Sequence, residues 1–331
     1  AKGTRSVAMG PSTEAIGIHT TAIGGGAKAV GDDATALGKD AKAIGKYSTA
    51  IGGLAKANQE FSNALGYQSN ASGYQSNAIG WNANATAQNA TAIGSGATAD
   101  RDDATALGYG ANASGWSSFA QGSSALASGD KSISIGDSSK ATADRSIAIG
   151  DEASTDNQSA SNTSTTKTQT NKQSVAIGPR TQAWGDQSTA IGNNVKSSGN
   201  SSVAIGGDDI DKVRDDHKDL YKSITGQALP GIPATESAGG ASVAVGAGAS
   251  SQGQFSTAIG MTSSSSGDGA VAIGPTANAS GLAGVAVGIQ SKASAKKTTA
   301  IGSVATATGE NATAIGSGAK ADGSSATAIG D

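Results

Sequence analysis

The chain has 331 residues and a net charge of −3, from 23 basic and 26 acidic residues. It contains 49 glycines, 3% aromatic residues and no cysteine, which excludes disulfides and cysteine-ligated metal sites. The balanced charge shows no basic footprint for nucleic acid or for an anionic membrane. No apolar stretch approaches the length of a membrane span, and no signal peptide is visible. Because large apolar residues are scarce, we do not expect a compact globular core.

A 14-residue repeat runs through most of the chain. Phased on the tripeptide Ala-Ile-Gly, a first block of repeats begins at Val7, Thr21, Thr35, Thr49, Asn63, Asn77, Thr91, Thr105, Phe119, Ile133 and Ile147. A second block begins at Val175, Thr189 and Val203, and a third runs from Val243 in steps of 14 to Thr327. Spacing this regular is typical of a solenoid, whereas a disordered low-complexity chain would not keep its phase.

Each repeat reads as two short strands. The first includes the last residue of one repeat and the first four of the next, as in 202–206, and the second covers positions 7 to 11, as in 97–101. Glycines after the Ile and near position 11 mark turns, where a positive φ or a close backbone approach excludes a Cβ. Stacked repeats would place coils about 4.8 Å apart in parallel sheets. The sequence therefore predicts an all-β fold, a parallel β-roll or solenoid.

The two faces of the first strand are both apolar, which is typical of a strand buried on both sides. Position 2 is Ala, and position 3 is almost always Ile, Leu or Val. A narrow coil can cover only one face, so we predict that the column at position 3 contacts another chain, because a monomer does not tolerate so long an apolar stripe. Closed symmetry as a dimer or a trimer would cover it. The predicted inter-chain core contains Ile23, Ile51, Ile93, Ile149, Ile177, Ile205, Ile259 and Ile301.

The sequence Ser-Val-Ala-Ile-Gly at 174–178 and 202–206, followed by strands of small residues, resembles the YadA-like head of trimeric autotransporter adhesins. The resemblance covers nearly the whole chain. It implies a left-handed β-roll intertwined as a homotrimer and displayed on a Gram-negative outer membrane. It also implies binding to host cells or to matrix proteins such as collagen, fibronectin or laminin, without a cofactor. Residues 1–6 fit the tail of a preceding repeat and Asp331 lies within another, so we expect a fragment whose stalk and anchor lie elsewhere.

Two insertions interrupt the repeats, which we assign to 1–150, 175–206 and 241–331. Residues 151–174 are rich in Ser and Thr, and we predict a polar excursion from the roll rather than a degenerate coil. Residues 207–240 form a charged insertion, in which helical spacing predicts a short amphipathic helix, although inserts in this family can also be hairpins. The residues with that spacing are Ile210, Val213, His217, Leu220 and Ile224.

The exposed aromatic residues are candidates for ligand binding, because Trp and Tyr are common anchors at interfaces. Tyr67, Trp81 and Tyr109 share position 5 of their repeats, with Ser95 as a gap, and Tyr74 and Trp116 share position 12. Both positions lie in turns. Alternatively, these side chains only cover the turns or contact a neighbouring chain.

Two polar features allow sharper hypotheses. Gln121 replaces the apolar residue at position 3, where three symmetry-related amides could pair or hold a water or an anion. Alternatively, it is a tolerated polar residue that sets the register. An acidic cluster near His217 offers oxygen ligands, but it lacks the calcium-loop order, so we predict a solvated helix face and no metal site. This cluster contains Asp208, Asp209, Asp211, Asp215, Asp216 and Asp219.

Signals for an enzyme are weak. The chain has only two histidines, His19 and His217, and lacks the phosphate-binding glycine motifs. A left-handed β-helix acyltransferase is one alternative, but its six-residue period does not divide 14. An ice-binding solenoid is another, suggested by the threonines at position 1, but Asn63 and Phe119 interrupt that column. The sequence therefore predicts a non-enzymatic adhesive head that acts through many weak contacts.

Overall fold

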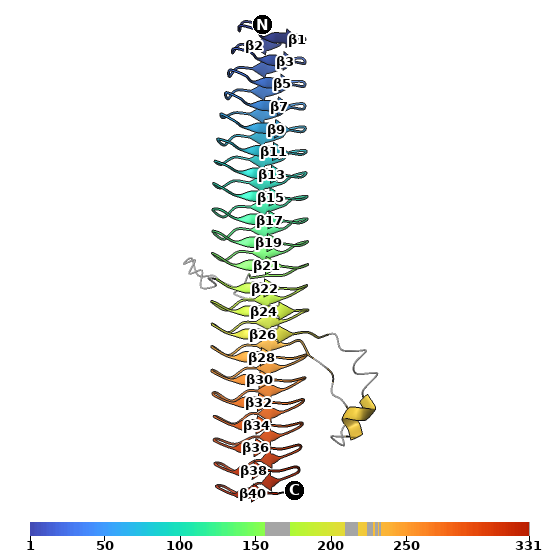
Figure 1. The fold of residues 1–331 in the computed structure, drawn as a ribbon, viewed down its shortest axis with the longest axis vertical. Helices are drawn as coiled ribbons and strands as arrows, with labels where there is room; N and C mark the ends of the chain where they lie inside the picture. The colour runs from blue at the N-terminus through green and yellow to red at the C-terminus, as the bar shows by residue number, and fades with distance from the viewer. Residues whose placement is uncertain (156–172, 209–217, 224–227, 229–230, 232, 331) are drawn as a thin grey trace, which may run out of the picture. The chain divides into compact units, whose positions relative to one another are not determined.

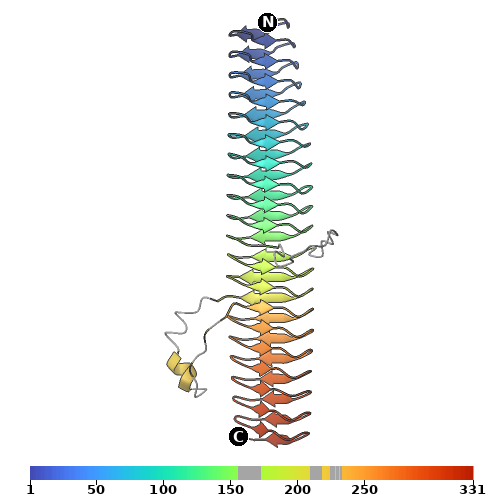
Figure 2. The ribbon, with the colours of Figure 1, turned by 180° about the vertical axis from the view of Figure 1, so that it is seen from behind.

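The computed structural model describes residues 1–155, 173–208, 218–223, 228, 231 and 233–330. The chain divides into two compact units, Ala1–Glu152 and Ala153–Asp331. Within each unit, successive coils of two strands stack on one another, and the turns of the coils line two opposite edges (Figures 1 and 2). The predicted all-β parallel solenoid with a 14-residue period is confirmed.

In the first unit, odd-numbered strands are the first strands of the coils and even-numbered strands are the second. The first strands are β1 (Val7–Met9), β3 (Thr21–Ile23), β5 (Thr35–Leu37), β7 (Thr49–Ile51), β9 (Asn63–Leu65), β11 (Asn77–Ile79), β13 (Thr91–Ile93), β15 (Thr105–Leu107), β17 (Phe119–Gln121), β19 (Ile133–Ile135) and β21 (Ile147–Ile149). The second strands are β2 (Glu14–Ala15), β4 (Lys28–Ala29), β6 (Lys42–Ala43), β8 (Lys56–Ala57), β10 (Asn70–Ala71), β12 (Asn84–Ala85), β14 (Thr98–Ala99), β16 (Asn112–Ala113), β18 (Leu126–Ala127) and β20 (Lys140–Ala141).

In the second unit the numbering is reversed, and the first strands carry even numbers. They are β22 (Val175–Ile177), β24 (Thr189–Gly192), β26 (Val203–Gly206), β28 (Val243–Val245), β30 (Thr257–Ile259), β32 (Val271–Ile273), β34 (Val285–Val287), β36 (Thr299–Ile301), β38 (Thr313–Ile315) and β40 (Thr327–Ile329). The second strands are β23 (Gln182–Ala183), β25 (Lys196–Ser197), β27 (Glu236–Ser237), β29 (Ser250–Ser251), β31 (Ser264–Ser265), β33 (Asn278–Ala279), β35 (Lys292–Ala293), β37 (Thr306–Ala307) and β39 (Lys320–Ala321).

The strands are shorter than predicted, and each turn contains a hydrogen bond of its own. After the first strand, the N–H of Ala27 donates to the carbonyl of Gly24 at 3.1 Å. After the second, the N–H of Ala34 donates to the carbonyl of Gly31 at 3.2 Å. The first strand keeps mainly positions 1 to 3 and the second only positions 8 and 9. The flanking residues still bond to the adjacent coil, as the N–H of Val30 does to the carbonyl of Ala43 at 2.8 Å.

The interior of each coil is filled by small side chains. Ala22 on the first strand and Ala27 and Ala29 around the second are fully buried, and equivalent residues repeat this pattern along both units. Position 2 of the first strand and positions 7 and 9 around the second therefore face inward. Because only Ala, Ser, Thr and one Val among the described residues have side chains buried there, the two strands of a coil lie too close together to bury an Ile between them.

Buried hydroxyl groups satisfy the backbone at the turns. Ser48 Oγ donates to the carbonyl of Gly45 at 2.6 Å, and Thr20 and Ser76 make the same bond to Gly17 and Gly73. A hydrogen bond offsets the cost of burying a hydroxyl, so these bonds help to explain why Ser or Thr can replace Ala inside the coil. Among the described residues, the buried hydroxyls of Ser118, Ser132, Ser174 and Ser188 have no such partner.

Glycine is required at two turn positions for different reasons. At position 4, Gly38 has a φ of +134°, which only glycine adopts readily. At position 11, Gly31 has no positive φ, but a Cβ there would meet the backbone of the next coil at Gly45. Both predicted reasons for glycine therefore operate: the close backbone approach in both turns, since a Cβ on Gly38 would also meet Gly52, and the positive φ at position 4.

The insertions leave the roll through different turns of a coil. Ser154 bridges to Gln182 in parallel, so the excursion begins after a second strand, and 156–172 lie outside the described residues. The second insertion begins after β26. The chain returns to the roll at β27, where Glu236 pairs with Lys196 of β25. Glu236–Ser237 therefore belong to the ladder, although the sequence assigned them to the insertion, because this two-residue strand carries no Ile-Gly signal.

Part of the predicted helix is described. Residues 218–223 are helical, and the hydroxyl of Tyr221 donates to Thr276 Oγ1 at 2.9 Å. Leu220 is exposed there. The other residues of the predicted apolar face, Ile210, Val213, His217 and Ile224, lie outside the described residues. In the described part of the chain, no helix has the length and apolar character needed to cross a membrane.

Candidate functional site: exposed columns and turn edges

An apolar column runs along the outer face of the first strands in each unit. Ile191 and Ile205 are paired in register on β24 and β26, with Val245 next on β28. Ile205 remains 39% exposed, while Ala204 beside it in the strand is fully buried. The coil thus covers one face of the strand and leaves the other to solvent.

The predicted core residues all lie in this column. Six of them are at least 36% exposed, and the two others are half-buried. The exposed residues are Ile51, Ile93, Ile177, Ile205, Ile259 and Ile301, and the half-buried ones are Ile23 and Ile149. Their position on the outer face of the first strands in each unit agrees with the apolar stripe that the sequence predicts, and their role in an inter-chain core stays a prediction.

The aromatic residues at position 5 lie along one edge of the first unit. Tyr67 and Trp81 occupy adjacent coils, and both side chains are about half exposed or more. Ser95 follows in the next coil and separates Trp81 from Tyr109, which is 70% exposed. The structure therefore places two of the three on adjacent coils and the third two coils beyond Trp81.

The residues at position 12 lie in the other turn. Tyr74 and Trp116 are exposed, but the coils that contain Gln88 and Asp102 separate them. They do not form one site. Tyr74 instead belongs to an aromatic cluster that the sequence analysis missed.

This aromatic cluster contains Tyr47, Phe61 and Tyr74, from three successive coils. The rings of Tyr47 and Phe61 are stacked, with centroids 5.1 Å apart, and Phe61 meets Tyr74 edge to face at 6.0 Å. Tyr47 and Phe61 are 14 residues apart, at position 13 of their repeats, and this spacing was the signal that could have found them. All three side chains are exposed at 40% or more.

The third tryptophan also lies in a polar cluster that the sequence analysis did not identify. Lys196 Nζ lies 5.0 Å from the centre of the Trp184 ring and 3.1 Å from Glu236 Oε1. These contacts are within the range of a cation–π interaction and an ion pair. They link the coils on either side of the charged insertion.

The two polar hypotheses have different outcomes. Gln121 lies in the apolar column between Leu107 and Ile135, with its side chain exposed, so its pairing with other chains stays a prediction. Within the acidic cluster only Asp208 and Asp219 are described, and Asp208 Oδ2 accepts a hydrogen bond from Asn194 at 2.7 Å. Among the described residues no group of acidic or histidine side chains could hold a metal ion.

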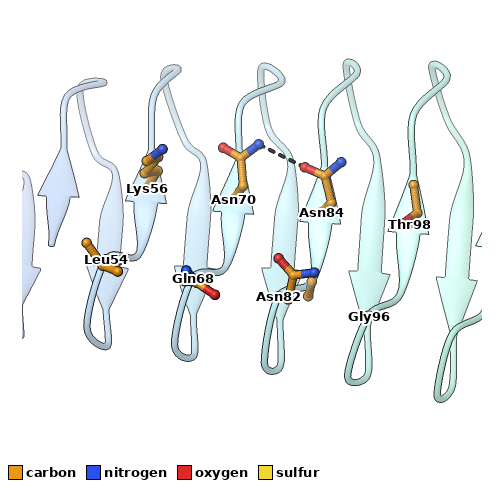
Figure 3. Close-up of a pocket in the computed structure, with 9 residues that line it drawn as sticks. Leu54, Lys56, Gln68, Asn70, Asn82, Asn84, Gly96 and Thr98 are labelled. Carbon is orange, nitrogen blue, oxygen red and sulfur yellow. Dashed lines mark hydrogen bonds between the residues drawn. The ribbon is translucent and has the colours of Figure 1, made fainter.

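A groove of about 470 Å³ lies on the outer side of the second strands. Lys56, Asn70, Asn84 and Thr98 project from consecutive second strands, and Leu54, Gln68, Asn82 and Gly96 lie in the turns before them (Figure 3). Asn70 Nδ2 donates to Asn84 Oδ1 at 2.8 Å, so the amides form a short ladder along the stack. The groove is therefore lined mainly by amides, with one lysine.

The geometry defines a class of protein, a β-roll of 14-residue coils. Its interior holds small side chains, and no described residue covers its outer Ile column. Comparison with known families agrees with this class. The YadA head domain repeat matches residues 15–41, 43–69, 64–83, 71–97, 85–111, 102–127, 113–138, 127–153, 170–194, 237–263, 265–288, 279–305 and 307–331. The chain belongs to the YadA head family and is an adhesin head built from β-roll repeats.

Among solved structures, the collagen-binding domain of the Yersinia adhesin YadA is similar to this chain. The two are 27% identical over 48% of this chain and 67% of that chain, with a TM-score of 0.30. No curated protein sequence matches the chain at a significant level.

Proposed function

We propose that this chain is the adhesive head of a homotrimeric protein on the surface of a Gram-negative bacterium. It attaches the cell to host cells or to matrix proteins of the collagen, fibronectin or laminin type. The contacts are non-enzymatic and need no cofactor. Membership of the YadA head family supports this proposal.

The observation that carries the proposal is the exposed Ile column. Ile191 and Ile205 lie side by side, each more than a third exposed, and the column continues on successive strands in each unit. Soluble monomers rarely expose so continuous an apolar surface. The coil interior has no room for these side chains, because Ala fills it. Three chains packed through this column would bury it around a common axis.

Binding would follow from repetition rather than from a deep pocket. A weak contact that recurs along the coils and around a trimer raises the overall affinity by linking the separate binding events. The exposed aromatic residues of the turns supply the proposed contacts, because their rings combine a large apolar area with a polar atom. They are Tyr67, Trp81, Tyr109, Tyr74 and Trp116.

The test combines sedimentation with a binding screen. We expect the parent chain to sediment as a trimer and to bind at least one purified collagen, fibronectin or laminin. Against that ligand, the Trp81→Ala and Trp116→Ala variants should bind about tenfold more weakly, as expected for the loss of an anchor. A well-folded monomer at micromolar concentration would contradict the shared core. If both variants bind as tightly as the parent, the proposed aromatic contacts are wrong, and the proposed trimer is not affected.

A further inference from the structure

Three lysines of the first unit lie in register on adjacent second strands. Lys28 on β4 pairs with Lys42 on β6, and Lys42 pairs with Lys56 on β8. We call these three residues the lysine column. Parallel strands bring in-register residues about 5 Å apart, and like charges directly opposite each other destabilise a sheet.

The other lysines at this position avoid such an arrangement in the described strands. Lys292 lies between Asn278 and Thr306, and Lys196 lies between Gln182 and Glu236. Only β4, β6 and β8 place lysine against lysine. The repulsion is therefore a local feature of this surface and not a property of the repeat.

Of the three residues of the lysine column, only Lys28, at one end, forms an ion pair with a carboxylate among the described residues. Lys28 Nζ lies 3.3 Å from Glu14 Oε2, in the coil before it. Lys42 and Lys56 make no ion pair in the described part of the chain, and both are exposed. Two adjacent positive charges thus face solvent without an ion pair among the described residues, although Asp40 lies in the turn before Lys42.

The lysine column continues directly into the groove. Lys56 is the first of four groove residues on consecutive second strands, followed by Asn70, Asn84 and Thr98 (Figure 3). These side chains offer hydrogen-bond donors and acceptors at the same spacing as the ammonium groups. A straight surface results, cationic in its first half and amide-rich in its second.

We propose that this surface binds a linear acidic polysaccharide laid along the stack of coils. The anionic groups of the sugar chain would pair with Lys42 and Lys56, since bonds between ammonium groups and anions are the strong ones. The sugar hydroxyls would bond to the amides of the groove. Single-stranded nucleic acid fits less well, because its bases need aromatic stacking partners, and no aromatic ring lines the groove.

The experiment uses the full 331-residue chain in its assembled form and four probes. Heparin carries sulfates, hyaluronan carries only carboxylates, dextran is neutral, and an oligonucleotide of dT carries phosphates. The test variant is Lys42→Gln with Lys56→Gln. The matched control is Lys292→Gln with Lys320→Gln, which removes two charges from the same position of the repeat in the other unit.

We expect the parent to bind heparin or hyaluronan, with affinity that falls as salt is raised, and to bind dextran more weakly than either. The test variant should lose about tenfold or more in affinity, while the control stays within about twofold. Circular dichroism should show both variants folded, since these positions are exposed and Gln keeps part of the aliphatic stem.

The inference is overturned if neither acidic polysaccharide binds, if both double variants lose affinity equally, or if the dT oligonucleotide binds more tightly than both polysaccharides. It does not depend on the proposed matrix-protein binding. A test variant that loses polysaccharide but keeps its oligomeric state and its matrix ligand would support two separate surfaces.

Discussion

Ile191 and Ile205 pair in register on β24 and β26, and the side chain of each is more than a third exposed. The alanine before each of them in its strand, Ala190 or Ala204, is fully buried. The same strand thus has one face buried inside the coil and one face exposed to solvent. This relationship follows from the coil width, because an interior filled by Ala has no space for Ile. It makes the outer column the natural place to disturb the proposed assembly.

We expect Ile205→Asp to weaken assembly by about a hundredfold or more, because it would bury a carboxylate without a partner in the shared core. Sedimentation velocity over a dilution series measures this change. Ile205→Val is the control, since Val245 already occupies the next position of the column. An unchanged mass for the Asp variant would place Ile205 outside the interface.

Gly38 should be far less tolerant of substitution than Gly96, although both have positive φ. A Cβ on Gly38 would lie 2.6 Å from the carbonyl oxygen of Gly52, whereas nothing lies within 4 Å of a Cβ on Gly96. We expect Gly38→Ala to lower the free energy of unfolding by about 3 kcal/mol and Gly96→Ala by about 1 kcal/mol. Denaturant titration of both variants checks the order. Equal losses would mean that neither the close approach to Gly52 nor the larger φ of Gly38 adds to the cost.

The repeat phase predicted most of the fold because one pattern of small, apolar and glycine residues recurs in almost every coil. It failed at Glu236–Ser237, because the insertion separates this second strand from its first strand, and its place is set by pairing with β25. The stack of Tyr47 on Phe61 was missed for another reason. Both residues have positive φ, with values of 56° and 58°, at a turn position that aromatic residues rarely occupy.

The contact between Tyr47 and Phe61 should be measurable as a coupling energy. We expect a double-mutant cycle with Tyr47→Leu and Phe61→Leu to give about 0.5–1.5 kcal/mol, as found for stacked aromatic pairs. Tyr67 and Trp81 provide the control cycle, because they also occupy adjacent coils but no ring contact joins them in the described part of the chain. Similar coupling in both cycles would show that adjacency alone, without stacking, produces the effect.

Asp32 should make the first unit more stable at neutral than at acidic pH. Its carboxylate accepts a hydrogen bond from the Ile18 N–H at 3.0 Å and lies 3.5 Å from Lys46 Nζ. The Ile18 bond first, and then Lys46, lower the pKa of Asp32 below its ordinary value of 3.8. A lowered folded-state pKa contributes stability above the unfolded value, and this stability is lost as the pH falls through the folded value.

The matched substitution for this test is Asp32→Asn. An amide can keep the hydrogen bond to the backbone, as Asn200 does for Asp186 at 3.1 Å, but it neither titrates nor attracts Lys46. We expect the parent to melt at a higher temperature than the variant at pH 7, and the difference to shrink as the pH falls below about 4. Thermal melts at a fixed ionic strength measure it. A difference in melting temperature that stays constant between pH 7 and pH 2 would show that the charge of Asp32 contributes nothing to stability.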